Sequence, residues 1–252
     1  MKVFSVIGIS KSGKTTTIEN IIKGLRNRRY SVGSVKEIHY EKFAIDTEGT
    51  NTDRHKKAGS QLVTARGFYE TDILYSGKLH IDEILKAYNQ DFVVLEGVKD
   101  INAPKIITAH NLQDIDKLLD DTVFAISGRI SNEIDNYKGI PVINSLEKVD
   151  ELVDLIEDKV FERLPDFTKK CCGECGYSCR ELCAKIINGE ASRNDCVLSH
   201  NNISLCVDGQ EITMVPFVQN ILKNAVIGVV KELEGYKKGA DIQIKIGEKF
   251  GK

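Results

Sequence analysis

Apolar and polar residues follow one another along this chain in two different rhythms. Short apolar runs predict strands, and an all-apolar run such as residues 92–95 is typical of a parallel strand buried on both faces. Stretches with apolar residues three or four positions apart predict helices with one buried face. The predicted strands are residues 1–7, 30–36, 61–66, 71–75, 92–96, 105–108, 122–127 and 140–144. The predicted helices are residues 15–26, 53–58, 81–88 and 146–161. Strands that alternate with helices predict an α/β fold with a doubly wound, mostly parallel sheet.

The end of the chain has a smaller pattern of its own. We expect a hairpin with strands at 203–207 and 211–215 around an Asp208-Gly209 turn. A helix at 217–233 and a closing strand at 242–246 follow. These elements predict a small α+β C-terminal region.

The first predicted strand runs directly into a glycine-rich loop. Gly8-Ile9-Ser10-Lys11-Ser12-Gly13-Lys14-Thr15 matches G-x-x-x-x-G-K-[ST], the loop that binds the phosphates of nucleoside triphosphates. Its backbone N–H groups precede a helix, where the helix dipole favours an anion. Lys14 can reach the terminal phosphates, and the Thr15 hydroxyl can ligate Mg²⁺. The predicted nucleotide-binding residues are Gly8, Ser10, Lys11, Ser12, Gly13, Lys14, Thr15 and Thr16. The alternative, a glycine-serine turn before a surface helix, is disfavoured by the strand-loop-helix context.

Two acidic residues are candidates for chemistry beside this loop. Glu96 ends the apolar strand at 92–96, where it can hold Mg²⁺ through water or orient an attacking water. Asp46 lies in the long polar stretch 37–52 and is a second candidate for the Mg²⁺ site with Thr15. The alternatives are a strand-end carboxylate at the solvent edge and a solvated loop acid. Lys14 and Glu96 are the predicted catalytic residues.

Composition excludes several functional classes. The net charge is −2, which offers no electrostatic case for binding nucleic acid or an anionic membrane. We find no apolar run near 18 residues and no room for a signal peptide before the first strand. We therefore expect a cytoplasmic protein.

All seven cysteines fall between residues 171 and 206. A cluster of an odd number of cysteines favours a metal site over a disulfide framework. The change in composition, with Pro165 beside it, predicts a boundary near residue 165. We expect three parts: a nucleotide-binding domain at 1–165, a cluster domain at 166–200 and the region 201–252.

The spacing Cys172-x2-Cys175-x3-Cys179-x16-Cys196 supplies four thiolates. Soft thiolates select zinc or an iron–sulfur cluster, and zinc sites tend to show two C-x2-C pairs. Only one such pair is present here, which favours a cluster over a structural zinc site. Cys171, Cys183 and Cys206 have a plainer interpretation as small apolar residues or spare thiols.

Residues 1 to about 163 resemble the molybdopterin-guanine dinucleotide biosynthesis protein B (MobB) family. The resemblance lies in the phosphate loop, in Asp46-x-x-Gly49-x-x-Thr52-Asp53-Arg54-His55-x-x-Ala58-Gly59, and in Leu95-Glu96-Gly97. It implies GTP and Mg²⁺ binding, weak GTPase activity, a homodimer and a helper role in attaching GMP to molybdopterin. The chain departs from the family at Lys36-Glu37, where Lys-His is usual, and at Gly49-Thr50-Asn51-Thr52, where Gly-Lys-Asp-Ser/Thr is usual. No Asn-Lys-x-Asp guanine-binding motif is present, so guanine is implied by the resemblance alone.

Residues 170–197 resemble the small four-iron–four-sulfur (4Fe–4S) domain of corrinoid and acetyl-CoA pathway proteins. The matching residues are Cys172, Cys175, Gly176, Tyr177, Cys179, Ala184, Ile187, Gly189, Glu190 and Cys196. The second gap is one residue shorter than usual, which makes Cys183 an alternative to Cys179 as third ligand.

The resemblances together imply a GTP-binding protein of molybdenum or tungsten cofactor biosynthesis that carries an iron–sulfur module for redox or partner docking. Its expected partners are GTP and a MobA-like synthesis protein or an apo-molybdoenzyme. Two alternatives stay open. One is a nucleotide-switched adaptor or metallochaperone for an anaerobic molybdo- or tungsto-oxidoreductase, and the other is the same nucleotide domain with a structural zinc site.

Overall fold

The computed structural model describes most of the chain. The described residues are 1–165 without residue 42, 175–196, 203, 205–207, 210–212, 214, 216–237, 240 and 242–244. They fall into two compact units, Met1–Arg193 and Asn194–Lys252. The boundaries that the sequence predicts near 165 and 200 stay a prediction.

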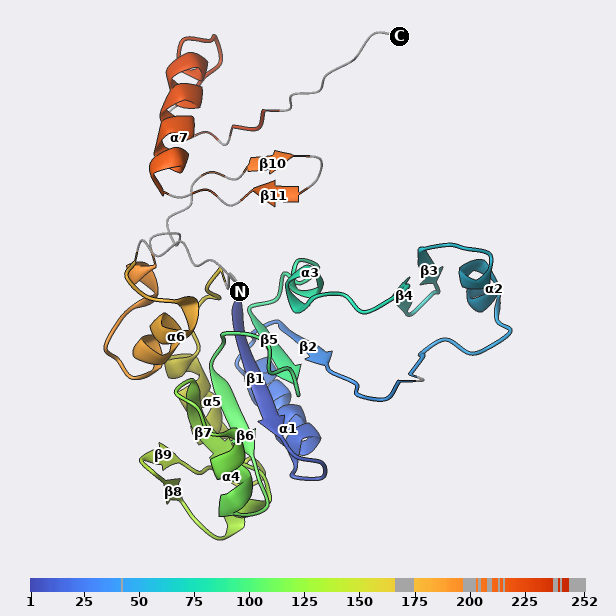
Figure 1. The fold of residues 1–252 in the computed structure, drawn as a ribbon, viewed down its shortest axis with the longest axis vertical. Helices are drawn as coiled ribbons and strands as arrows, with labels where there is room; N and C mark the ends of the chain where they lie inside the picture. Colours follow the sequence, from blue (N-terminus) through green and yellow to red (C-terminus); the bar gives the residue numbers. More distant parts are fainter. Residues whose placement is uncertain are drawn as a thin grey trace. The chain divides into compact units, whose positions relative to one another are not determined.

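A five-stranded sheet forms the centre of the first unit (Figure 1). Its order is β2-β5-β1-β6-β7, and every neighbouring pair is parallel. The strands are β1 (Lys2–Gly8), β2 (Val32–Lys36), β5 (Phe92–Glu96), β6 (Lys105–Thr108) and β7 (Val123–Ser127). Because all five run the same way, their carboxyl ends meet at one edge of the sheet. The predicted α/β fold with a mostly parallel sheet is confirmed.

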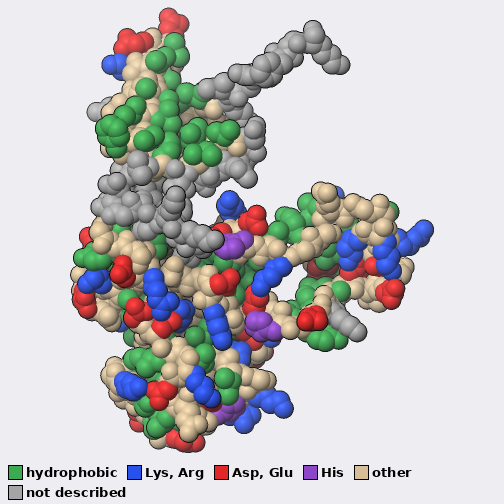
Figure 2. Space-filling model, viewed as in Figure 1, with side chains coloured by type: hydrophobic (Ala, Val, Ile, Leu, Met, Phe, Trp, Pro, Cys, Tyr) green, Lys and Arg blue, Asp and Glu red, His purple; other side chains and the backbone are tan. Residues whose placement is uncertain are grey.

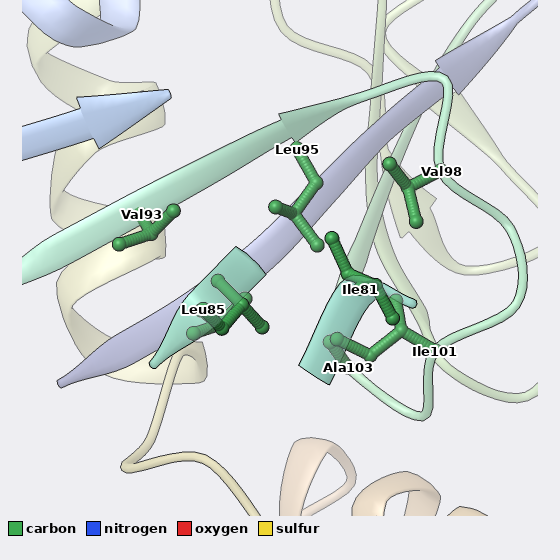
Figure 3. Packing of buried hydrophobic residues seen from close by; sticks show 8 residues of the cluster. Ile81, Leu85, Val93, Leu95, Val98, Ile101 and Ala103 are labelled. Atoms are coloured by element: carbon green, nitrogen blue, oxygen red, sulfur yellow. The ribbon is translucent and has the colours of Figure 1, made fainter. Parts of the chain in front are cut away.

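Helices cover both faces of this sheet. On one face, α3 (Ile81–Leu85) contributes Ile81 and Leu85 to a cluster with Val93 and Leu95 of β5, as Figure 3 shows. Farther along that face, α4 (Leu112–Leu118) adds Ile115 to a second buried cluster. On the other face, α1 (Lys14–Asn27) packs against α5 (Val149–Lys159). Their contact is close, since a Cβ on Gly24 would lie 2.7 Å from a Val153 methyl group.

The segment between β2 and α3 forms a separate substructure in the first unit. Strands β3 (Leu62–Arg66) and β4 (Thr71–Tyr75) pair with each other as an antiparallel two-stranded sheet. Helix α2 (Asn51–Lys57) packs beside β3 and begins where the Thr50 hydroxyl accepts a hydrogen bond from the Asp53 N–H. The two predicted strands are present, but neither joins the central sheet.

Several elements differ from the sequence-based expectation. Helices α4 and α6 (Cys179–Ile187) were not predicted, and α3 ends at Leu85, three residues early. The expected edge strand at 140–144 is reduced to β9 (Ile140–Pro141), which pairs with β8 (Asn136–Tyr137), and to a single bridge from Val142 to Ile126. Short 3₁₀ helices η1 (Arg129–Asn132) and η2 (Arg193–Asp195) complete the set in this part of the chain.

The second unit contains a short hairpin and a helix. Strands β10 (Leu205–Val207) and β11 (Gln210–Ile212) are antiparallel, and α7 (Pro216–Val230) follows. The predicted turn residues Asp208 and Gly209 lie outside the described residues. The predicted closing strand is wrong at Ile242 and Ile244, which lie in no strand. The alternation of apolar and polar residues predicted a strand there, but a strand also needs a neighbouring strand to bond with. Figure 2 shows apolar side chains over α7, where Phe217 is 72% exposed. Of the helices that the structure describes, none is both long enough and apolar enough to cross a membrane.

Candidate functional site

The glycine-rich loop leaves β1 at the carboxyl edge of the sheet and closes against β6. A Cβ on Gly8 would lie 2.3 Å from Thr108 Oγ1 and 2.5 Å from the Thr108 carbonyl oxygen. Gly13, the N-cap of α1, has a φ of 104° in the left-handed region. Glycine is therefore required at these two positions for different reasons: close approach at Gly8 and backbone conformation at Gly13.

Side chains of β6 and the residues after it hold the loop in shape. The buried hydroxyls of Ser12 and Thr108 are 2.7 Å apart, and the Ser12 hydroxyl also donates to the Ile9 carbonyl. His110 Nε2 lies 3.0 Å from the carbonyl oxygen of Lys11, a residue with a positive φ of 61°. His110 Nδ1 faces Asp114 Oδ2 at 3.3 Å. Sequence reasoning missed Thr108 and His110 because their partners are about 100 residues away.

The Lys14 ammonium lies over the loop that precedes it. It donates hydrogen bonds to the carbonyls of Gly8, at 3.0 Å, and Ile9, at 2.5 Å. Burial lowers the pKa of Lys14 from its ordinary value, and the negative charge of Glu96 opposes this effect. The cation is thus positioned where phosphate oxygens can replace two neutral carbonyl acceptors.

Thr15 and Glu96 meet although they are 81 residues apart in the sequence. The Thr15 hydroxyl donates to Glu96 Oε1 at 2.9 Å. Lys36 Nζ, at the end of β2, is 3.1 Å from the same oxygen. A hydroxyl and a carboxylate side by side at a phosphate-binding loop are the oxygen ligands that Mg²⁺ accepts directly or through water.

A cavity of about 520 Å³ opens at this edge of the sheet, within the size range of small-ligand sites. Predicted residues that line it are Ser10, Lys11, Gly13, Lys14, Thr15, Thr16 and Glu96. Gly8 and Ser12, also predicted, do not line the cavity. They lie against Thr108 of β6 on the other side of the loop. The remaining lining residues, which sequence reasoning missed, are Thr17, Gly128, Arg129, Asn132, Asn144, Ser145 and Leu146. The signal that could have found most of them is their place just after the apolar runs that end at Ser127 and Ile143.

Asp46 does not belong to this cavity. It lines a different one, beside Lys56 and Tyr75. Its carboxylate pairs with Lys56 Nζ at 2.9 Å and accepts hydrogen bonds from the Thr50 and Thr52 hydroxyls. These contacts, that from Lys56 first, lower the pKa of Asp46 to about 2. The structure thus brings Thr15 and Glu96 together without Asp46, whose Mg²⁺ role stays a prediction.

Helix α6 is attached at the opposite, amino edge of the sheet. Arg180 Nη2 pairs with Asp121 at 2.9 Å and with Asp120 at 3.3 Å, just before β7 begins. Asp120 also pairs at 2.8 Å with the buried ammonium of Lys105, the first residue of β6. Burial would raise the pKa of Asp120, but the hydrogen bonds from Lys105 and Thr122 outweigh it and hold the pKa at about 2. This ion-pair group therefore joins α6 to the starts of β6 and β7, the strands whose far ends support the phosphate loop.

The predicted cluster ligands are placed only in part. Cys172 lies outside the described residues, and so does Cys171. Cys175 sits in a turn, with its Sγ 3.3 Å from the Tyr177 carbonyl oxygen. Cys179 is the first residue of α6, because Ser178 and Glu181 form a capping box that starts the helix there. Within the described residues, no three candidate metal ligands meet at one point.

Two buried thiols share a side of α6. Cys179 and Cys183 are four residues apart, so they project in similar directions, and Cys183 is fully buried. Cys196, in the second unit, is also buried. Thiolates at the beginning of a helix, where backbone N–H groups are available, suit the soft iron of an iron–sulfur cluster. Thiols are the donor type that such a cofactor takes, and the choice between Cys179 and Cys183 stays open.

Comparison with protein families gives two matches. A family model described as molybdopterin guanine dinucleotide synthesis protein B matches residues 3–128. A second model, provisionally described as an iron–sulfur cluster, matches residues 169–198. The two matches cover the phosphate-loop fold and the cysteine-rich segment respectively.

Individual relatives agree with these matches. A protein of Methanocaldococcus jannaschii, provisionally named a molybdopterin-guanine dinucleotide biosynthesis adapter protein, is 30% identical over 98% of this chain and 97% of its own length. The corresponding adapter of Haemophilus influenzae is 28% identical over 62% of this chain and 88% of its own length. The crystal structure of Bacillus subtilis MobB superposes with a TM-score of 0.54 at 22% identity, covering 65% of this chain and all of that one. That structural likeness shows a shared fold.

Proposed function

This chain belongs to the molybdopterin guanine dinucleotide synthesis protein B family, and from that membership we propose that it is a GTP-binding adapter of molybdopterin-guanine dinucleotide biosynthesis with weak GTPase activity. The observation that carries the proposal is the convergence of Lys14, Thr15 and Glu96 on one cavity at the carboxyl edge of the sheet. Lys14 and the loop N–H groups bind the phosphates. Thr15 and Glu96 hold Mg²⁺, and Glu96 orients the attacking water.

The lysine substitution tests this site. Lys14→Ala removes the cation that the loop positions, so GTP affinity measured by calorimetry should fall by about 100-fold or more. Lys23→Ala, an exposed lysine on the same helix, is the matched control and should leave affinity unchanged. Equal GTP affinity in Lys14→Ala and wild-type protein would refute the assignment.

We further propose that the cysteine-rich segment holds a 4Fe–4S cluster, with Cys172, Cys175, Cys179 and Cys196 as its ligands. The iron–sulfur family match and the buried thiols of α6 support this. Helix α6 of this segment is attached at the amino edge of the sheet, opposite the edge that carries the phosphate loop. This arrangement favours docking of a partner, a MobA-like protein or an apo-molybdoenzyme, over direct electron transfer at the nucleotide.

Anaerobic purification tests the cofactor. The wild-type and Lys14→Ala proteins should both be brown, with visible absorbance that bleaches on reduction and about four irons per chain. A colourless protein with stoichiometric zinc would instead establish a structural zinc site.

We also propose a homodimer. The supporting observation is the two-stranded sheet β3–β4, whose more exposed face carries Leu62, Ile73 and Tyr75 and whose turn exposes Phe68 and Tyr69 completely. Exposed apolar residues on a sheet with open edges are typical of an association surface. A second copy of the chain can cover the same surface symmetrically.

A further inference from the structure

The nucleotide cavity extends beyond the phosphate loop to the segments that follow β7 and β9. Arg129, Asn132, Asn144 and Leu146 line this far end, which we call the base end. Among the described residues that line the cavity, these are the ones beyond the loop that can meet the base of a nucleotide whose phosphates lie on it. The polar groups of the base end therefore decide which base is accepted.

The side-chain amide of Asn144 has one orientation. The backbone N–H of Leu146 donates to Asn144 Oδ1 at 2.9 Å. A backbone N–H can only donate, so the carbonyl oxygen of Asn144 must face it and the amide nitrogen must point away.

Asn144 in turn fixes Asn132. Asn144 Nδ2 donates to Asn132 Oδ1 at 2.8 Å. Because the nitrogen of Asn144 can only donate, Asn132 must present its oxygen to Asn144 and its own amide nitrogen elsewhere. A single backbone group thus orients two side chains in series.

The base end consequently offers donors. Both amide oxygens accept a hydrogen bond, which leaves the Asn132 amide N–H groups, the second N–H of Asn144 and the Arg129 guanidinium as donors. Among the described residues that line the cavity, Glu96 is the only carboxylate, and it lies at the phosphate end with Thr15. Guanine carries two acceptors, O6 and N7, on one edge, whereas adenine has a donor at position 6.

We propose that Asn132, oriented by Asn144, recognises the 6-keto group of the bound purine and that the 2-amino group of guanine is not recognised. This inference rests on the proposed GTP site and adds the means by which guanine is chosen without an Asn-Lys-x-Asp motif. Leu146, 70% exposed beside the cavity, supplies an apolar surface for the face of the base. The carboxylate that would bind the N1 and N2 hydrogens of guanine is not among the described lining residues.

Three nucleotides test this assignment in the full-length wild-type protein. GTP and ITP share the 6-keto group and differ only in the 2-amino group, so their affinities should agree within about threefold. ATP places a donor opposite the Asn132 donors, so it should bind about 10- to 100-fold more weakly. An ITP affinity more than about tenfold below that of GTP, or equal GTP and ATP affinities, would overturn the proposal.

Two isosteric substitutions separate recognition from positioning. Asn132→Asp replaces the donors with acceptors while still accepting from Asn144, so the GTP-to-ATP affinity ratio should fall by about tenfold or more. Asn144→Asp keeps the hydrogen bond from the Leu146 N–H. Because aspartate has no N–H to donate, Asn132 must turn its amide nitrogen toward residue 144 and its oxygen toward the base. The ratio should therefore fall because the oxygen of Asn132 then faces the base. Glu133→Gln, next to Asn132 but outside the cavity lining, is the control and should leave the ratio unchanged.

The outcomes distinguish the two proposals. If no triphosphate binds the wild-type protein, the proposed function fails, and the base assignment with it. If GTP and ATP bind equally and Lys14→Ala abolishes both, the phosphate site stands and the base assignment is wrong. If the ratio is unchanged in both aspartate variants, a different group recognises the base.

Discussion

A methyl group at position 8 has no room in the phosphate loop. The hypothetical Cβ meets Thr108 Oγ1, the Thr108 carbonyl and Ser12 Oγ at distances between 2.3 and 2.6 Å. Two of these three atoms belong to Thr108 of β6. The hydrogen bond between the Ser12 and Thr108 hydroxyls also holds the loop against this strand. The first glycine of the motif is therefore a packing requirement between β1 and β6.

Gly8→Ala should consequently destabilise the protein. Forcing a methyl group into a filled site costs about 1–3 kcal/mol, and moving the loop away from β6 should weaken GTP binding as well. Urea unfolding and calorimetry measure the two effects. Gly228→Ala is the matched control, since the same methyl group there meets nothing within 4 Å and lies in helix α7. Stability of Gly8→Ala equal to that of wild type would show that the loop has more freedom than the contacts indicate.

At the scale of elements, α6 is the link between the cysteine-rich segment and the sheet. A capping box at Ser178 and Glu181 starts the helix, and Arg180 in its first turn pairs with Asp120 and Asp121. The other side of the helix is buried and carries Leu182, Cys183 and Ile187. The position of Cys179 is thus set by a helix start that is tied to the sheet.

Ser178→Ala should loosen this helix start. Loss of an N-cap costs about 1 kcal/mol, so Cys179 should be held less firmly and the cluster should be lost faster in the presence of an iron chelator. Visible absorbance followed over time, anaerobically, measures the loss. Ser178→Thr retains a hydroxyl cap and should behave as wild type, and GTP affinity should be unchanged in both variants. Equal rates of cluster loss in all three proteins would show that the start of α6 does not hold the cluster.

At the scale of the whole molecule, the proposed sites of the first unit lie on different parts of its fold. Within the first unit, the phosphate loop occupies the carboxyl edge of the sheet and the α6 ion pairs occupy the amino edge. The substructure of α2, β3 and β4 adds a surface that takes no part in the central sheet. The proposed nucleotide binding, cluster docking and self-association can therefore be tested one at a time by separate substitutions.

Ile73→Lys should convert the proposed dimer to a monomer. The residue is 58% exposed in the middle of β4, so a lysine there should destabilise the monomer little but would be buried in the dimer. Light scattering should give twice the chain mass of 28.1 kDa for wild type and the single mass for the variant. Leu112→Lys, an exposed apolar residue on α4, is the control and should stay dimeric. A wild-type protein of single mass at micromolar concentration would end the proposal.

The sequence by itself determined most of the features that depend on neighbouring residues. The parallel strands followed from apolar runs, the phosphate loop from eight consecutive residues, and the cysteine-rich segment that the iron–sulfur family model matches from its cysteine spacing. Helix α4 was missed because its seven residues carry a weak periodic signal, although Asn111 caps it. The hairpin of β3 and β4 was recognised as two strands, but sequence cannot say which sheet a strand joins.

Only the tertiary structure decided which distant residues meet. It placed Glu96 against Thr15 and separated Asp46 from both, because the long loop after β2 leads to a different substructure. It also brought Asn132 and Asn144 to the nucleotide cavity and fixed their orientations through one backbone N–H. Local patterns record periodicity and spacing, whereas a binding site is assembled from strand ends that are contiguous only after the sheet has formed.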